Sequence, residues 1–287
     1  MSTTTAPAAS RASSPGTLSQ LTFGGILKSE WIKLASLRST LWCYGLMIAI
    51  TIGFGVLVAL TLTDAPGGQP PVEVQQGTAV QVATLAIGFT ALVSVVLGAL
   101  VITGEYGTGM IRSTLTAVPT RLPALFGKVL VFGAVTFVVG LIAIVGTALV
   151  TAPLLPRIGI TPDFADPGYL LALVGGAGYL ALIGVLALAV GAILRHSAGA
   201  IAAALGLILV VPTILLILSA VLQADWLANV GSFLPDAAGS RMFSYSQDGL
   251  SVAPGLLLEP WQGLLVLLAW DAVLLLAAAV LLKRRDA

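Results

Sequence analysis

The sequence predicts an all-α integral membrane protein with six transmembrane helices. Of its 287 residues, 58% are hydrophobic and only 9% are charged, and its mean hydropathy is +1.06. Soluble domains carry roughly a quarter charged residues. Six apolar stretches are each long enough for a helix to cross the ~30 Å hydrocarbon core of a bilayer. Catalysis of reactions in water is therefore not the expected activity of this chain.

The six stretches define one transmembrane domain over residues 41–283. Its spans are expected at about 41–62, 79–102, 129–150, 169–194, 200–222 and 262–282. An even number of spans places both termini on one side of the membrane. Eleven Lys and Arg residues then fall on the terminal side, against Arg157 and Arg241 on the other. Because cytoplasmic loops keep the basic residues, both termini, including the tail 284–287, are predicted to be cytoplasmic in a multi-pass protein of the cell membrane.

The first forty residues contain two different segments. Residues 1–20 are mostly Ser, Thr, Ala and Pro with one charge, a composition that predicts a disordered tail. It is not expected to be a signal peptide, since the first apolar run begins about forty residues in. In residues 21–40, Phe23, Leu27, Trp31 and Leu34 share one helical face, which predicts an amphipathic helix in the membrane interface. The alternative is a basic segment that only sets orientation.

Polar residues are concentrated in the connection Thr103–Lys128 between the second and third spans. Three of its four charges, Glu105, Arg112, Arg121 and Lys128, are basic, so it is predicted to be cytoplasmic. Its glycine cluster and Pro119 predict a short helix, a break and a new helix. Such a loop could dock an internal partner, or it could be an ordinary positive-inside loop. The residues alone leave both interpretations open.

The later spans contain three special features. The fourth and fifth are rich in Gly and Ala, which permits close helix packing in lipid, and Pro212 is expected to kink the fifth. The connection 223–261 contains semi-apolar pieces too short to span, which predict short helices at, or dipping into, the outer leaflet.

Asp271 lies near the middle of the last span, where insertion scales put an Asp at ~2.5–3.5 kcal/mol. We therefore expect it to face protein or water. It could line a pathway or carry a proton. It could instead be protonated, or hydrogen-bonded to Thr136 or Thr147, and stabilise the bundle. The second, structural interpretation is favoured, because buried polar groups usually serve packing through satisfied hydrogen bonds.

Several chemistries lack their motifs. No G-x-x-x-x-G-K-[ST] sequence is present to hold ATP phosphates. One cysteine, Cys43, and one histidine, His196, provide neither a disulfide framework nor a metal site. No basic patch suits nucleic acid, and no Ser/His/Asp set or H-E-x-x-H motif suits proteolysis. No enzyme activity, metal or cofactor is therefore expected in this chain.

Three motifs occur in order on the six spans: SEWIKLASLRST, GEYGTGMIRSTLTAVPTRLPALFGK and FLPDAAGS. Together they resemble the membrane subunit of a type 2 ABC exporter, of an actinobacterial-like kind, and the likeness runs from about Thr22 to Lys283.

This resemblance implies two permease subunits, each contacting a separate ATP-binding subunit that holds ATP and Mg²⁺. It implies that Phe23 to Leu37 is the interface helix, with Trp31, Lys33 and Leu34, and that Gly107 to Ala117 is the coupling helix. The implied ATPase-coupling residues are Glu105, Gly107, Thr108, Arg112, Pro119, Arg121 and Lys128. Asp271 has no place in the family pattern.

The expected function is thus that of a permease subunit for ATP-driven export. The alternative is a secondary, proton-coupled transporter or half-transporter that uses Asp271. A third interpretation, a membrane anchor, would predict a polar domain that is missing. A two-fold dimer is expected through spans one and five, where Gly53, Gly55 and the run Ala200–Gly206 offer close-packing faces. The sequence does not specify the cargo.

Overall fold

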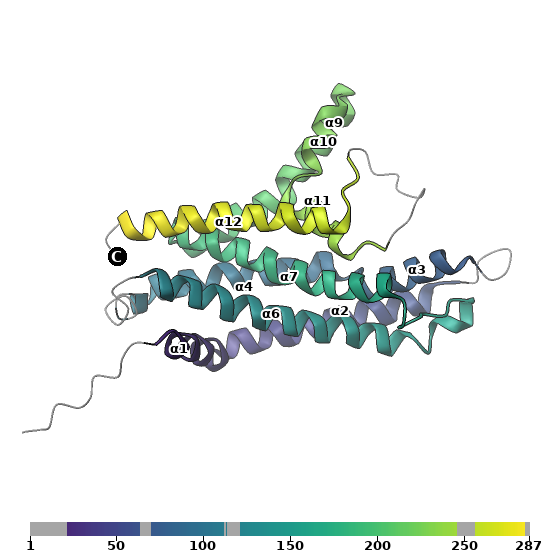
Figure 1. Ribbon diagram of the computed structural model, residues 1–287, viewed down its shortest axis with the longest axis horizontal. Helices are drawn as coiled ribbons and strands as arrows, with labels where there is room; N and C mark the ends of the chain where they lie inside the picture. Colours follow the sequence, from purple (N-terminus) through teal and green to yellow (C-terminus); the bar gives the residue numbers. More distant parts are fainter. Residues whose placement is uncertain (1–21, 64–69, 112, 114–120, 246–255, 285–287) are drawn as a thin grey trace, which may run out of the picture.

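The computed structural model describes residues 22–63, 70–111, 113, 121–245 and 256–284 (Figure 1). Over these residues the chain is helical without strands, and six helical segments are long and apolar enough to cross a membrane. This confirms the predicted fold class.

The six candidate spans are α2, α3 with α4, α6, α7, α8 through α9, and α12. The elements are α1 (Phe23–Ser36), α2 (Arg38–Thr61), α3 (Val72–Thr84), α4 (Ile87–Gly107), α6 (Leu122–Thr151), η1 (Leu155–Ile158), α7 (Pro167–Leu194), α8 (Ser197–Leu205), η2 (Gly206–Val210), α9 (Val211–Leu222), α10 (Asp225–Gly231), α11 (Pro235–Ser240), η3 (Arg241–Phe243) and α12 (Pro260–Arg284).

Helix α7 is the centre of the bundle, with α4, α6 and α12 packed around it. In its most apolar window 78% of residues are buried, against 11% in the fifth span. Small residues make the closest contact possible: a Cβ on Gly98 of α4 would collide with the backbone of Gly184 in α7. Ser94 Oγ also donates to the Leu180 carbonyl over 2.7 Å. The fourth span is therefore the one against which α4, α6 and α12 pack.

The second span is longer than the 79–102 expected. Its helical segment runs from Val72 to Gly107 with a break between α3 and α4. The added residues include Gln75 and Gln76, whose side chains hydrogen-bond to Thr161 and Asp163 in the connection before α7. Polar contacts with the connection before α7 therefore accompany the longer helix. A hydropathy pattern does not indicate such contacts.

The fifth span is irregular where Pro212 predicted a kink. Pro212 has no N–H for the carbonyl four residues earlier, and η2, which ends two residues before Pro212, forms a π-helical turn. Such turns accommodate one extra residue per helical turn. Beyond it, α9 projects away from the bundle together with α10 (Figure 1), and most of its side chains are exposed.

The short helices expected between the last two spans are present as α10 and α11, followed by η3. The α11–η3 segment packs against the bundle. A Cβ on Gly175 of α7 would collide with the Met242 carbonyl, and one on Gly263 of α12 with the Ala238 carbonyl. Tyr179 of α7 donates to the carboxylate of Asp236 over 2.6 Å.

Three of the small residues expected at a dimer contact pack inside the chain instead. A Cβ on Gly55 would collide with Thr147 of α6, and Ala200 and Ala204 are fully buried. Gly53, by contrast, has open space beside it. Ala202 and Ala203 are exposed, and Gly206 also has open space. Packing within one subunit therefore accounts for Gly55, Ala200 and Ala204, for which the expected dimer face is wrong, and the expectation for the other small residues stays a prediction.

Candidate functional site

Four charged side chains from three helices form a buried cluster at the end of the bundle that carries α1. We call Glu30 and Lys33 of α1, Glu105 of α4 and Lys128 of α6 the charge cluster. Lys33 Nζ lies 2.7 Å from Glu30 Oε1 and 2.9 Å from Glu105 Oε1. Lys128 Nζ lies 2.5 Å from Glu30 Oε2 and 2.8 Å from Glu105 Oε1. Each lysine thus bridges both carboxylates.

Local packing explains how α1 reaches this position. The Thr22 hydroxyl caps α1 by accepting a hydrogen bond from the Gly25 N–H over 3.2 Å. Ile26, Glu30 and Leu34 recur at helical spacing and form its buried face. A Cβ on Gly127 would lie 2.8 Å from Ile26 Cγ2. The glycine at this position lets α1 cross α6 beside Lys128, which brings Glu30 to its partner.

The electrostatics of the cluster depend on all four members. Glu30, Glu105 and Lys128 are each at most 5% exposed, so each carries a desolvation cost that only its partners offset. Glu105 also lies near the C-terminus of α4, where the helix dipole disfavours a negative charge. Burial opposes protonation of Lys33, but its contacts with Glu30 and Glu105 outweigh that effect and raise the pKa of Lys33 above 10.5. The two negative charges of Glu30 and Glu105 are matched by the two positive charges of Lys33 and Lys128.

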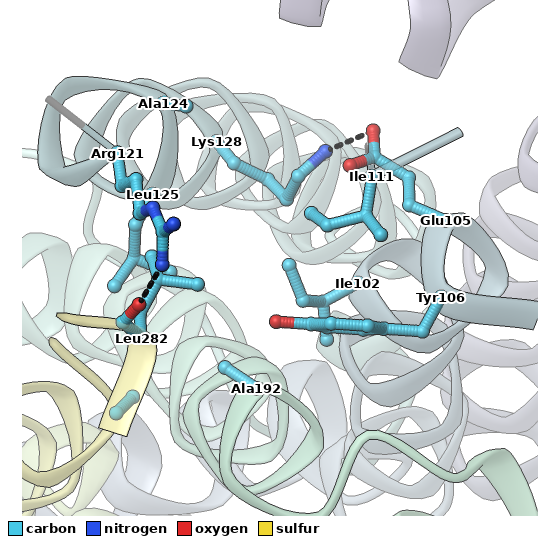
Figure 2. Close-up of a pocket in the computed structure, with 11 residues that line it drawn as sticks. Ile102, Glu105, Tyr106, Ile111, Arg121, Ala124, Leu125, Lys128, Ala192 and Leu282 are labelled. Atoms are coloured by element: carbon cyan, nitrogen blue, oxygen red, sulfur yellow. Dashed lines mark hydrogen bonds and ion pairs between the residues drawn. The ribbon is translucent and has the colours of Figure 1, made fainter. Parts of the chain in front are cut away.

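A narrow pocket adjoins the cluster (Figure 2). Figure 2 shows Lys128 pointing to Glu105 on one side and Arg121 pointing to Leu282 on the other, with Tyr106 between α4 and α7. Arg121 Nη1 donates to the Leu282 carbonyl over 3.0 Å. The Arg195 guanidinium lies 5.2 Å from the centre of the Tyr106 ring. The same end therefore joins α4, α6, α7 and α12 by polar contacts.

The structure brings together only some of the residues expected to couple to an ATPase. Glu105 and Lys128 are in the cluster, and Arg121, at φ 60°, precedes α6. Gly107 is the last residue of α4 and does not begin a separate helix. Thr108 caps α4, with its hydroxyl donating to the Gly104 carbonyl over 2.8 Å. Of the predicted coupling helix, Met110, Ile111 and Ser113 are helical, whereas Arg112 and residues 114–117 lie outside the described residues, as does Pro119.

The expected interface helix is present as α1, with different roles for its three residues. Trp31 is 54% exposed and Leu34 is buried in the core, while Lys33 belongs to the cluster. The placement of α1 in a membrane interface stays a prediction. The sequence pattern does not single out Glu30 as a site residue. Its i,i+3 spacing to Lys33 was a visible signal, but its contact with Lys128 spans 98 positions.

Asp271 does not have the hydrogen bonds expected for it. It is 4% exposed, and within the described part of the chain neither carboxylate oxygen has a hydrogen-bond partner. Thr136 Oγ1 lies 2.9 Å from Tyr44 Oη, and Thr147 donates to the Ala143 carbonyl. The Thr136 hydroxyl is hydrogen-bonded to Tyr44 of α2, and the Thr147 hydroxyl to a carbonyl of its own helix. The expected hydrogen bond from either threonine to Asp271 is therefore wrong.

Comparison with known proteins identifies the family. No curated protein matches the chain, but the sequence profile described as ABC-2 family transporter protein matches residues 25–287. The match includes the charge cluster, the connection after α4 and all six candidate spans. The chain is therefore a member of the ABC-2 transporter family, a membrane permease component.

Proposed function

We propose that this chain is the permease subunit of an ATP-driven exporter and couples to a separate ATPase through the end of the bundle that holds the charge cluster. The observation that supports this is the cluster itself, which joins α1 to two spans beside the connection 108–121. On this proposal the termini are cytoplasmic, and ATP and Mg²⁺ are bound by the partner subunit. Family membership and the basic residues of this end support the same orientation.

The cluster can transmit a displacement because its partners are costly to separate. Breaking one pair of a buried cluster leaves an uncompensated charge and costs about 3–5 kcal/mol. A push on the connection between α4 and α6 would therefore move α1, α4 and α6 together. Arg121 extends this linkage to α12 through the Leu282 carbonyl.

A second copy of the chain, or a related chain, would complete the pathway. The fifth span is only 11% buried, and α2 exposes Trp42 and Leu46. Cysteines at Leu46 and Leu216, in a Cys43→Ser background, should crosslink between subunits in membranes. Leu149 of α6, which is equally exposed, provides the control position. Crosslinks from Leu149 alone would overturn this arrangement.

The experiment that tests coupling is purification of the tagged chain from its own membranes, followed by measurement of ATP hydrolysis. We expect an ATPase to copurify, and Arg112→Glu to reduce its retention and transport. Lys28→Glu, an exposed charge reversal on α1, is the matched control and should retain both. A preparation without ATP hydrolysis, or normal transport by Arg112→Glu, would overturn the proposal.

A further inference from the structure

Arg241 lies between two cavities of opposite character at the end of the bundle away from the charge cluster. One cavity, of about 300 Å³, lies between α9, α10 and α11 and is mainly apolar. The other, of about 310 Å³, lies between α3 and η3 and is lined by polar groups that include Gln81, Thr84 and Ser244. Ser240 and Arg241 line both cavities.

The guanidinium of Arg241 is only partly used by the protein. Its Nε donates to the Leu258 carbonyl over 2.9 Å, which holds the side chain in place. Among the described residues all ion pairs belong to the charge cluster. Asp236, the acid on the adjacent helix α11, accepts instead from Tyr179 over 2.6 Å. Within the described part of the chain the two terminal nitrogens of Arg241 make no hydrogen bond or ion pair, so they can contact an anion.

The level of Arg241 along the bundle lies about 6 Å inside the edge of the hydrocarbon core, close enough for a long basic side chain to reach the lipid headgroups. Its neighbour Met242 packs on Gly175, about 12 Å along α7 from Pro167 at ~1.5 Å per residue. A 28-residue helix is about 42 Å long and overhangs a ~30 Å hydrocarbon core by about 6 Å at each end. Exposed Trp226 and Trp261 lie at this end, as aromatic belts do at membrane interfaces.

We propose that this region binds an anionic phospholipid, with its phosphate on Arg241. The planar guanidinium suits bidentate contact with phosphate oxygens. The polar part of the headgroup occupies the cavity beside Gln81 and Thr84, and an acyl chain occupies the apolar cavity beside Leu215 and Leu227. A cation at this depth is costly without a partner, and the lipid phosphate supplies one. The site requires no particular transport cargo.

The test measures lipid retention by the full-length chain. The purified protein is equilibrated with mixed micelles containing equal amounts of phosphatidylcholine and phosphatidylglycerol, and retained lipids are counted by native mass spectrometry. We expect preferential retention of phosphatidylglycerol, reduced about tenfold in Arg241→Gln, because charge-assisted hydrogen bonds to phosphate are lost. Arg157→Gln is the matched control: this Arg lies at the same end and also donates to backbone carbonyls.

Two further variants test the same lipid site if Arg241→Gln is unstable. Arg241→Lys preserves the charge and should retain part of the preference. Ala228→Phe fills the apolar cavity and should reduce retention with Arg241 intact. Equal retention by wild type and Arg241→Gln, or an equal loss in Arg157→Gln, would overturn the proposal. Displacement of the lipid by excess glycerol phosphate would identify a soluble phosphate ligand and would also overturn it. None of these outcomes depends on an ATPase, so they are independent of the coupling proposal.

Discussion

Replacement of Lys128 tests whether the charge cluster acts as one unit. Lys128 Nζ contacts both Glu30 and Glu105, and Met has a similar length without the charge. Lys128→Met leaves two buried carboxylates with only Lys33, whose side chain is 23% exposed. We expect a loss of about 3–5 kcal/mol in the free energy of unfolding, the usual cost of removing one partner of a buried ion pair.

A double-mutant cycle separates the cluster from the individual side chains. Glu105→Gln alone should also destabilise the chain, because it leaves an excess of positive charge. In the double variant Lys128→Met with Glu105→Gln, Glu30 and Lys33 again balance. The combined loss should therefore be smaller than the sum of the single losses by about 1–3 kcal/mol.

The assay is equilibrium unfolding of the purified chain in mixed micelles, followed by circular dichroism as the denaturing detergent fraction rises. Lys28→Met, at an exposed position on α1, is the control and should stay within about 0.5 kcal/mol of wild type. The coupling should depend little on salt, because buried pairs are weakly screened. Single effects that add within about 0.5 kcal/mol would refute the argument that the four residues act together.

Three other changes test separate parts of the molecule. Gly175→Ala should destabilise the chain by about 1–3 kcal/mol in the same assay, because its Cβ would collide with a backbone carbonyl of η3, whereas Gly88→Ala, which has open space, should be neutral or stabilising. Asp271→Asn should leave transport unchanged across pH; lost transport with normal stability and ATPase coupling would instead support proton coupling. The hydrogen bond from Tyr245 lowers the pKa of Asp166 below 3.8, so its contribution is present above that value and is lost as the pH falls through the folded-state pKa. Thermal unfolding should show Tyr245→Phe less stable by at most about 1 kcal/mol near neutral pH, because Asp166 is largely solvated, with a smaller difference in strong acid; a constant difference at all pH values would contradict this.

Sequence reasoning was strongest where a property is local. Hydropathy is summed over neighbouring residues, so the six spans could be recognised without knowledge of their packing. The irregularity before Pro212 is local for the same kind of reason, since a missing N–H affects only the preceding turn. Family motifs near Trp31 and Glu105 likewise pointed to the end of the bundle that holds the charge cluster.

Pairing between helices required the tertiary structure. The side chains of Glu30 and Lys128 meet across 98 positions, and that contact exists because Gly127 lets α1 approach α6. Small residues permit close approach in lipid but do not specify which helix approaches, so Gly55 was assigned to a dimer face although it packs against Thr147.

The sequence by itself determined that this chain is a six-span membrane protein with an excess of basic residues at the ends of one set of helices. It did not determine which charges are buried or what surrounds them. The position of Asp271 could be read from the sequence, but only the packed helices showed that Thr136 and Thr147 are committed elsewhere. The two cavities beside Arg241 likewise follow from the return of α11 and η3 onto α7. Burial and ion pairing are properties of several helices together, and the bilayer, which selects each span by its own composition, imposes no unique arrangement on them.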